Sequence, residues 1–367
     1  MPNIFEVFGF PVADRTQQAE TVRQSRTCPF MGEICDGGGN RYQTKIKLTA
    51  QEPLSDYFHP DITEVIPGIC SIQAGDDIWV VCPRRLFSAK CDAAGIPTVN
   101  RALQPYESDL LIHAGVPQGV DIGVWSEVAL KHRVDDAEIN YQFDYILAPL
   151  VAKPFSQLPQ ILPGEFTPDD LGDLSKSARK NGYYQLQHKS ADAVITLPDL
   201  DQMFILEVMT ASTSGSDAEK STDIRSAFRN YLLGVEHTSP GINKRQVWGR
   251  MVSQLFAKTA LANEWKARTI WVIQDSLLQN IERTTRLNTK AVSSHPERNI
   301  SLVVMAYRQN AIKTKEIAYQ TTINGDAGIN FEGDNTFTDI LLPKVTPPKI
   351  ELLQAIMRRK LAAILNL

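Results

Sequence analysis

Residues 203–215 combine an apolar run with one carboxylate, Glu207, and end in small hydroxylated residues and Gly215. The apolar run predicts a buried strand, and the residues that follow it predict a turn. An ionised carboxylate is unstable when buried alone, so Glu207 requires a metal ion, a proton or a basic partner. A glutamate that pairs with a nearby arginine at the end of a strand also meets this requirement. This stretch alone leaves both interpretations open.

Two further acids lie upstream, in a predicted β-hairpin. If its loop is Asp135-Asp136, Glu127 lies directly across from Asp144. Because side chains alternate along a strand, Phe143 and Tyr145 are then expected on the face opposite to Asp144. Two neighbouring carboxylates on one face repel each other unless a cation lies between them. The arrangement therefore favours a divalent metal.

Another hairpin is predicted from residues 191–197, through a turn at 198–201, into the strand of Glu207. In that register Asp192 pairs with Glu207 and competes with Asp144 for the role of metal ligand. An aspartate on one strand, a glutamate on the next and another acid upstream are typical of metal-dependent phosphodiester hydrolysis. The carboxylates hold magnesium, which activates water and neutralises the charge that develops on the phosphate.

The cysteines are confined to the first quarter of the chain, between Cys28 and Cys91. Four of them lie in or beside turn-forming sequences: Cys28, Cys35, Cys70 and Cys82. Backbone N–H groups in such turns point at the sulfur and stabilise a metal thiolate. Four thiolates suit a structural zinc ion or a single iron ion. The alternative is that they are buried as small apolar residues. Cys91 lacks the turn context and is expected to be a core or surface thiol.

In order and number these motifs resemble the NotI-type restriction endonucleases of the PD-(D/E)XK nuclease superfamily. The resemblance runs nearly end to end and includes Phe8-Gly9, Thr27-Cys28-Pro29-Phe30, Gly68-Ile69-Cys70, Val81-Cys82-Pro83, Glu127 ahead of residues 143–147, residues 206–210, Gly241-Ile242-Asn243, Val247-Trp248 and Arg250. The resemblance implies a type II restriction endonuclease that acts as a homodimer on double-stranded DNA. Its host would contain a cognate DNA methyltransferase.

The resemblance also implies roles for individual residues. Asp144 and Glu207 would bind catalytic Mg²⁺ with support from Glu127, and the four cysteines Cys28, Cys35, Cys70 and Cys82 would bind structural iron or zinc. Met209 departs from the pattern, because the superfamily usually has lysine at this position and the namesake has glutamine. A thioether donates no hydrogen bond to orient water. Lys131 and Lys189 are candidates for the missing donor.

Two other functions remain as alternatives to the endonuclease. One is a non-catalytic DNA-binding protein on a degenerate nuclease fold, which the methionine at position 209 favours and the retained acids oppose. The other is a metalloprotein with no nucleic-acid partner, which the acidic composition permits. Retention of three candidate acids makes the endonuclease the leading hypothesis.

DNA-reading residues are expected among the arginines at turns and helix starts. Arginine reads guanine through paired donors to O6 and N7. The candidates are Arg41, Arg84, Arg85, Arg245 and Arg250. Phosphate contact or plain solvation is the alternative for each of them. We expect at least one of Arg41, Arg84 and Arg85 to contact a base, because a bound metal would hold its loop rigid.

The resemblance implies an α/β (α+β) fold: a PD-(D/E)XK nuclease core, with a mixed central sheet flanked by helices, and an N-terminal four-cysteine module. The module is expected over residues 1–95 and the catalytic domain over 96–367, with a surface insertion around 150–190. Residues 95–120 predict a connecting loop, and residues 122–130 and 139–147 predict strands. Continuous apolar runs at 269–273 and 300–305 predict central strands that are buried on both faces.

Helices are expected in the second half of the chain. Ser216 is a candidate N-cap for a helix that carries Ile224, Phe228 and Leu232, and a second helix is expected around residues 247–256. A final amphipathic helix is expected after Pro347-Pro348, with an apolar stripe of Leu353, Met357, Leu361 and Ile364. Docking onto the parent fold and a dimer contact are the two roles considered for this helix.

The composition is that of an ordinary globular protein. The length of 367 residues predicts two to three domain-sized units. The chain is 43% hydrophobic and carries a net charge of −4 at pH 7. This charge argues against a general nucleic-acid coat protein but permits a local basic cleft. The sequence lacks both a membrane-length apolar run and an N-terminal signal pattern. A cytoplasmic location with reduced cysteines is therefore expected, and no membrane partner.

Overall fold

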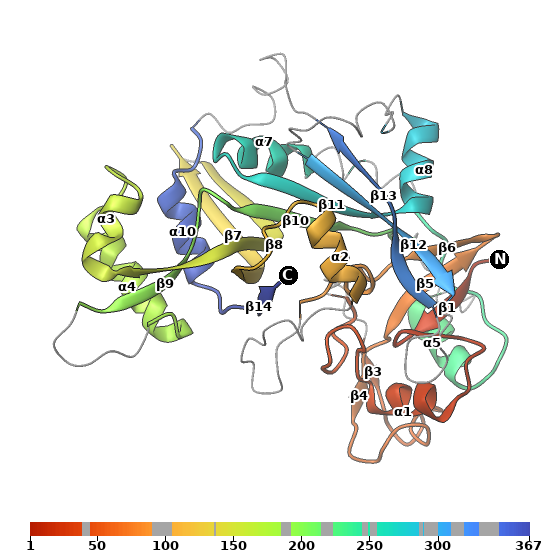
Figure 1. The fold of residues 1–367 in the computed structure, drawn as a ribbon. Helices are drawn as coiled ribbons and strands as arrows, with labels where there is room; N and C mark the ends of the chain where they lie inside the picture. The colour runs from red at the N-terminus through yellow and green to blue at the C-terminus, as the bar shows by residue number, and fades with distance from the viewer. Residues whose placement is uncertain are drawn as a thin grey trace.

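The computed structural model describes residues 1–38, 45–89, 105–135, 137–184, 192–213, 223–243, 249, 255–285, 289, 300–309, 319–329 and 345–367. Its main feature is a mixed eight-stranded sheet flanked by helices (Figure 1). The coarse fold class predicted from the sequence is therefore confirmed. No helix in the described ranges is long and apolar enough to cross a membrane.

Seven strands of the sheet follow the order β13-β12-β11-β10-β8-β7-β14, and β9 pairs with β8 off this path. The strands are β7 (Asp121–Val134), β8 (Ala137–Pro154), β9 (Val194–Pro198), β10 (Phe204–Met209), β11 (Arg268–Gln274), β12 (Ile300–Gln309), β13 (Tyr319–Ile329) and β14 (Ala363–Asn366). The neighbours β10, β11 and β12 run parallel, and every other pairing is antiparallel. The apolar runs of β11 and β12 are buried, as expected for central parallel strands.

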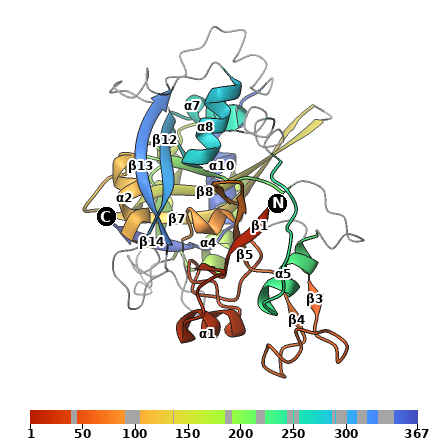
Figure 2. The ribbon, with the colours of Figure 1, turned by 90° about the vertical axis from the view of Figure 1, so that its right-hand side faces the viewer.

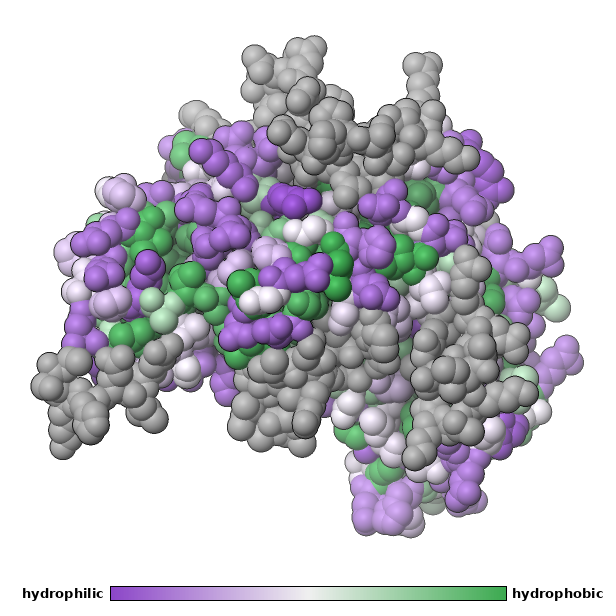
Figure 3. All heavy atoms as spheres, viewed as in Figure 1, coloured by the Kyte–Doolittle hydropathy of each residue, from purple (hydrophilic) through white to green (hydrophobic). Residues whose placement is uncertain are grey.

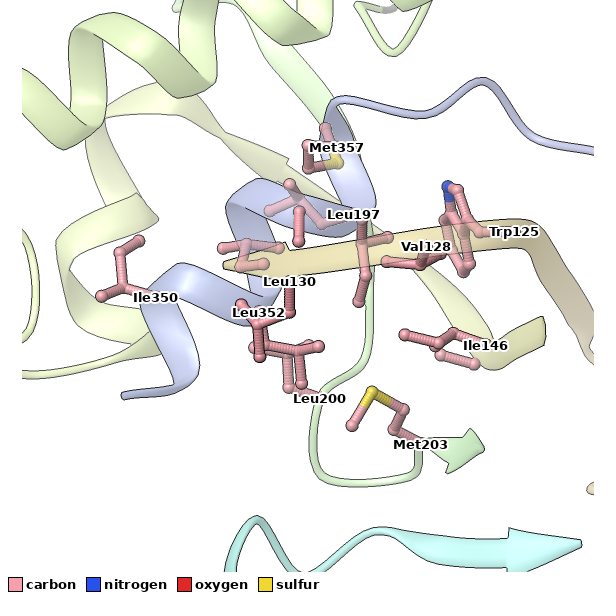
Figure 4. Close-up of a cluster of buried hydrophobic side chains, with 14 of the residues drawn as sticks. Trp125, Val128, Leu130, Ile146, Leu197, Leu200, Met203, Ile350, Leu352 and Met357 are labelled. Carbon is pink, nitrogen blue, oxygen red and sulfur yellow. The ribbon is translucent and has the colours of Figure 1, made fainter. Parts of the chain in front are cut away.

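One face of the sheet is covered by α10 (Lys349–Met357), α4 (Pro168–Asn181), α7 (Ala257–Glu264) and α8 (Asp275–Thr284). Figure 4 shows the part of this core where α10 packs on β7, with Leu130 close to Leu352. The other face is covered by α2 (Pro105–His113) and by residues 86–87. The predicted connecting loop at 95–120 is therefore wrong over α2, whose Leu110 and Leu111 are fully buried.

The predicted surface insertion at 150–190 is in part a core element. It contains the end of β8, the one-turn helices η2 (Phe155–Gln157) and α3 (Leu158–Ile161), and then α4. Leu158 and Leu174 are fully buried in the same cluster as α10. A capping box at Thr167 and Asp170 starts α4, with Pro168 in the first turn. The segment thus adds a helical layer to the sheet.

The C-terminal helix is shorter than its apolar stripe predicts. Helix α10 ends at Met357, and β14 then pairs with β7 at the edge of the sheet. Leu361 and Ile364 therefore do not lie on the helix. The side chains of α10 that are buried, Leu353 and Met357 among them, dock onto the parent fold.

The N-terminal residues form a separate four-stranded sheet of order β2-β1-β5-β6. Its strands are β1 (Asn3–Val7), β2 (Phe10–Pro11), β5 (Ile69–Ala74) and β6 (Asp77–Val80). The same region also contains the helix α1 (Gln17–Ser25), the strand pair β3 (Ile46–Lys47) and β4 (Glu64–Val65), and the 3-10 helix η1 (Pro83–Arg85). Figure 2 shows it beside α5 (Ile224–Leu232), whose Phe228 joins the same core. Asp223 caps α5, and the predicted cap Ser216 lies outside the described residues.

A buried ion pair of this region is hydrogen-bonded to the large sheet. The Arg85 guanidinium donates two hydrogen bonds of 3.1 Å to the Glu6 carboxylate, and both side chains are fully buried. The hydroxyl of Tyr307 on β12 also donates to Glu6 at 2.7 Å, and Arg85 donates to Thr321 on β13 at 3.3 Å. The hydrogen bonds of Tyr307 and Thr321 hold the N-terminal sheet against the end of β12 and the start of β13.

Among the described residues, hydrophilic ones predominate on the face shown in Figure 3. Hydrophobic residues on this face form several separate patches between hydrophilic ones. The exposed large hydrophobic side chains of the described ranges are likewise scattered, including Ile34, Val120 and Val345. This distribution is ordinary for a folded protein and singles out no apolar surface.

Candidate functional site

Asp144 and Glu207 lie side by side, as the resemblance implies. Strand β8 pairs with β10 through Tyr145 and Leu206, so the next position along places Asp144 beside Glu207. The Asp144 N–H donates to Glu207 Oε1 at 3.4 Å, and the Val208 N–H donates to Asp144 Oδ2 at 2.9 Å. Each carboxylate is therefore held by the backbone of the opposite strand.

Lys258 completes this group of charges. It lies in the first turn of α7, and its Nζ donates to Glu207 Oε2 at 2.6 Å. The ammonium also lies 5.9 Å from the centre of the Phe143 ring. Sequence reasoning did not identify Lys258, because it lies far from Glu207 in the chain and no local motif marks it. The sequence feature that could have identified it is a lysine in the first turn of a helix, followed directly by the buried residues 259–262.

Burial makes the acid pair electrostatically unfavourable without a cation. Burial and the neighbouring Asp144 raise the pKa of Glu207 to about 8, although Lys258 opposes the shift. Burial also raises the pKa of Asp144, again against the effect of Lys258. Two carboxylates and one ammonium leave one net negative charge when all are ionised. A divalent cation would remove this excess.

A cavity of about 190 Å³ opens beside Asp144. It is lined by Gly38, Pro83, Arg84, Glu127, Asp144, Tyr145, Val208 and Thr210. Glu127, Asp144, Tyr145 and Val208 come from β7, β8 and β10, whereas Gly38, Pro83 and Arg84 come from the cysteine-bearing N-terminal region. Glu207 does not line the cavity, and 4% of its surface is exposed. The N-terminal region therefore contributes directly to the candidate site.

Glu127 lies across from Asp144 in the register that the sequence predicts, between the pairs Ser126–Tyr145 and Val128–Phe143. Its backbone is in the left-handed region, with φ of 52°, which is strained for a residue with a side chain. The side-chain alternation breaks here, and Phe143 faces the α10 core while Tyr145 faces the α2 core. The prediction that these two rings share a face is therefore wrong.

Asp192 is not part of this site. Strand β9 pairs with β8, at Leu150–Pro198 and beyond, and not with β10. The Asp192 carboxylate instead accepts hydrogen bonds from the Ser156 backbone N–H, at 3.2 Å, and from the Ser156 hydroxyl. The predicted Asp192–Glu207 pairing is wrong, because the strand was identified correctly but its partner was not.

One of the two predicted lysine substitutes, Lys131, does not contact the acids. Lys131 lies near the tip of the β7–β8 hairpin, 69% exposed, and pairs with Glu138 at 3.7 Å. Lys189 lies outside the described residues. Met209, two residues after Glu207, is buried against β11 and α8 in an apolar cluster. The cation at this site comes from α7, so Met209 is free to pack in the core.

The predicted DNA-reading arginines differ in their surroundings. Arg84 lines the cavity, whereas Arg85 is fully buried with Glu6 and is therefore not placed to contact a base. Arg41, Arg245 and Arg250 lie outside the described residues. The two neighbours Arg84 and Arg85 point to different surroundings because η1 turns the chain between them.

The four cysteines Cys28, Cys35, Cys70 and Cys82 are buried, reduced and close enough to influence one another. Each sulfur accepts a hydrogen bond from at least one backbone N–H. The donors are Phe30 and Met31 for Cys28, Gly37 for Cys35, Gly9 for Cys70 and Arg84 for Cys82. Burial and the neighbouring Cys28 raise the pKa of Cys35 to about 12. These N–H groups are the ones that stabilise metal thiolates. Cys91 lies outside the described residues.

Within the described ranges, no group of three or more His, Cys, Asp or Glu side chains is arranged as a metal site. The four-cysteine metal site is thus not shown as such. Mg²⁺ often binds through one or two carboxylates together with substrate phosphates. The Asp144–Glu207 pair is consistent with that mode of binding.

A metal-content measurement tests the cysteine prediction. Protein purified without chelator is expected to contain about one iron or zinc ion per chain, and Cys70→Ser is expected to lose the metal and unfold at a lower temperature. Cys91→Ser is the matched control and is expected to retain both properties. Elemental analysis that finds well below one ion per chain in the parent protein would refute the metal site.

The acid pair predicts how stability depends on pH. Because the folded-state pKa of Glu207, about 8, lies above its ordinary value of 4.5, protonation favours the folded protein. This contribution is fully present below about pH 4.5 and is lost as the pH rises through about 8. In EDTA, the unfolding free energy of the parent should fall relative to Glu207→Gln between pH 5 and pH 9. Parallel curves from urea titrations would contradict the shift.

Comparison with known proteins adds no assignment: no protein-family model matches the chain, and no curated protein matches it.

Proposed function

We propose that this protein is a magnesium-dependent endonuclease that hydrolyses phosphodiester bonds in double-stranded DNA. The observation that supports this function is that Glu207 contacts both Asp144 and Lys258, and that Asp144 lines a cavity. Two adjacent carboxylates with a lysine are the groups that metal-dependent phosphodiester hydrolysis requires: the acids hold the metal, and the lysine orients water or stabilises charge.

Each side chain has a distinct role in this proposal. When bound, Mg²⁺ would activate water and neutralise charge on the phosphate. Asp144 and Glu207 would hold the ion, and Asp144 faces the cavity where a phosphate would enter. Lys258 keeps the Glu207 carboxylate oriented through its 2.6 Å contact and brings a hydrogen-bond donor to the site. Glu127 borders the cavity, where it would assist in holding the ion or its water.

The finer assignment is a type II restriction endonuclease of the NotI type, with a PD-(D/E)XK core. On this proposal, the four cysteines hold structural iron or zinc and position the DNA-contacting loops of the N-terminal region. The enzyme would act as a homodimer, since two copies related by a two-fold axis match a palindromic site. A cognate DNA methyltransferase would protect the host DNA.

The proposed function is tested with plasmid DNA of known sequence. The purified protein is incubated with several plasmids and with bacterial genomic DNA, in Mg²⁺ or in EDTA, and the fragment ends are sequenced. Discrete fragments that share a terminal sequence and require Mg²⁺ are expected. Asp144→Asn, purified in parallel, controls for contaminating nucleases because it removes one carboxylate without changing the side-chain volume.

Two other outcomes have defined meanings. Retarded migration of the DNA in Ca²⁺, without cleavage in Mg²⁺, would show a non-catalytic DNA-binding protein. If the protein neither binds nor cleaves DNA, the remaining alternative is a metalloprotein with no nucleic-acid partner. The Lys258–Glu207 contact makes the non-catalytic alternative less favourable, because the site has a cation although position 209 does not supply one.

A further inference from the structure

Arg84 holds an unusual position between the two halves of the candidate site. It belongs to the three-residue helix η1, directly after the Cys82-Pro83 dipeptide. Its side chain lines the same cavity as Asp144 and is 15% exposed. The guanidinium is thus carried by the cysteine-bearing region but faces the acids of the large sheet.

The contacts of Arg84 hold the guanidinium in place but do not use all of its hydrogen-bond donors. Nη1 donates to the hydroxyl of Tyr145 at 2.8 Å, and Nη2 donates to Asp36 Oδ2 at 3.3 Å. Nη2 also lies 3.9 Å from the Glu127 carboxylate. The Nε atom is buried and has no hydrogen-bond partner among the described residues. A buried donor without a partner is unfavourable and indicates a missing acceptor.

Arg84 differs from Arg85, the next residue in the chain. Arg85 forms a two-bond ion pair with one fully buried carboxylate, which is a structural arrangement. The carboxylates near Arg84 are instead 33% and 44% exposed and belong to separate segments. A phosphodiester, which also carries one negative charge, can therefore take their place, because their removal from the guanidinium returns them to water.

We infer that Arg84 binds a phosphate of the DNA backbone in the cavity beside Asp144. The planar fork of an arginine donates parallel hydrogen bonds to two oxygens of one phosphate, which a lysine cannot reproduce. The phosphate would lie between the guanidinium on one side and the acids on the other. Base contact and phosphate contact were both open for Arg84 from the sequence, and we favour phosphate contact because the cavity lies at the acids.

This inference deepens the proposed function and rests on it for the cleavage arm of its test. Binding is measured in Ca²⁺, in a series of salt concentrations, on a plasmid fragment. Each phosphate contact contributes close to one unit to the slope of log K against log salt. Arg84→Ala is therefore expected to lower the magnitude of this slope by about one unit on every sequence, whereas Arg84→Lys keeps the charge and the slope.

Cleavage rates distinguish the effect of the planar guanidinium group from the effect of its positive charge alone. Single-turnover rates in Mg²⁺ should fall by about 100- to 1,000-fold in Arg84→Ala, as for loss of one donor to developing charge. They should remain reduced in Arg84→Lys. Arg133→Ala is the control, because Arg133 is exposed on the same strand as Glu127 but does not line the cavity. Thermal unfolding of each variant shows whether folding is retained.

The outcomes distinguish this inference from the proposed function. A reduced slope in Arg84→Ala supports the phosphate contact even if the parent protein cuts no DNA. An unchanged slope, with a rate equal to the parent's in folded Arg84→Ala, overturns it even if the parent cuts normally. Loss of preference at one base pair, at an unchanged slope, would show base contact and also overturn it. A parent that binds no DNA removes both proposals.

Discussion

Replacing Lys258 by methionine is expected to slow DNA cleavage in Mg²⁺ by about 100- to 10,000-fold, while binding in Ca²⁺ changes little. Methionine keeps the length of the side chain but removes the ammonium that contacts Glu207 at 2.6 Å. Without this donor, the Glu207 carboxylate loses its orientation and the site loses its hydrogen-bond donor. Single-turnover cleavage measured at saturating enzyme isolates this effect from binding.

The control for this experiment is Lys131→Met. Lys131 is 69% exposed near the hairpin tip, and its charge is lost in the same way. Its rate should equal that of the parent. If both lysine variants cleave at the parental rate, Lys258 is a structural partner of Glu207 alone. If Lys131→Met is the slower of the two, the cation that the sequence suggested was the functional one.

The largest loss of stability is expected from Glu6→Ala. The variant removes the carboxylate that neutralises the buried Arg85 guanidinium, and breaking a buried ion pair in this way typically destabilises a protein by about 3–5 kcal/mol. Tyr307 and Ser71 lose their acceptor at the same time. Chemical denaturation followed by circular dichroism measures the change. We expect the N-terminal region to lose its cooperative unfolding with the large sheet, since these bonds join the two.

Glu64→Ala is the matched control for the buried pair. Glu64 forms a pair with Lys45 in which both side chains are nearly half exposed. Exposed pairs typically contribute about 0–1 kcal/mol, so this variant should unfold almost as the parent does. Equal destabilisation by the two variants would contradict the special role of Glu6. The double variant Glu6→Met with Arg85→Met should recover part of the stability, because no charge remains unpaired.

Several features of the site were predictable from local sequence. The hairpin register of β7 and β8 follows from a turn at Asp135 and two strand patterns, and it places Glu127 opposite Asp144. The strand of Glu207 is recognisable from its apolar run. In each case the interacting residues are close in sequence or share one repeating pattern.

Other features depend on contacts between distant segments. The strand at 194–198 was recognisable, but an apolar pattern identifies a strand without identifying its neighbour. Leu361 and Ile364 continue the helical spacing of α10 although the chain has already entered β14. Lys258 reaches Glu207 only because α7 packs on the sheet, and no spacing in the sequence encodes that contact. Tertiary packing determines all three.

Strand β8 has one further consequence, for how this chain tolerates changes of length. Its edge is shared in succession by β10, at Tyr145–Leu147, and by β9, at Leu150–Pro154. The chain leaves β8 at its far end, forms α3 and α4, returns through β9 and enters β10. Residues added in the connections of that excursion, outside the buried side chains of α3 and α4, are expected to leave the Asp144–Glu207 contact unaltered. The 63-position interval between the two acids can therefore lengthen without a change in the register that brings them together.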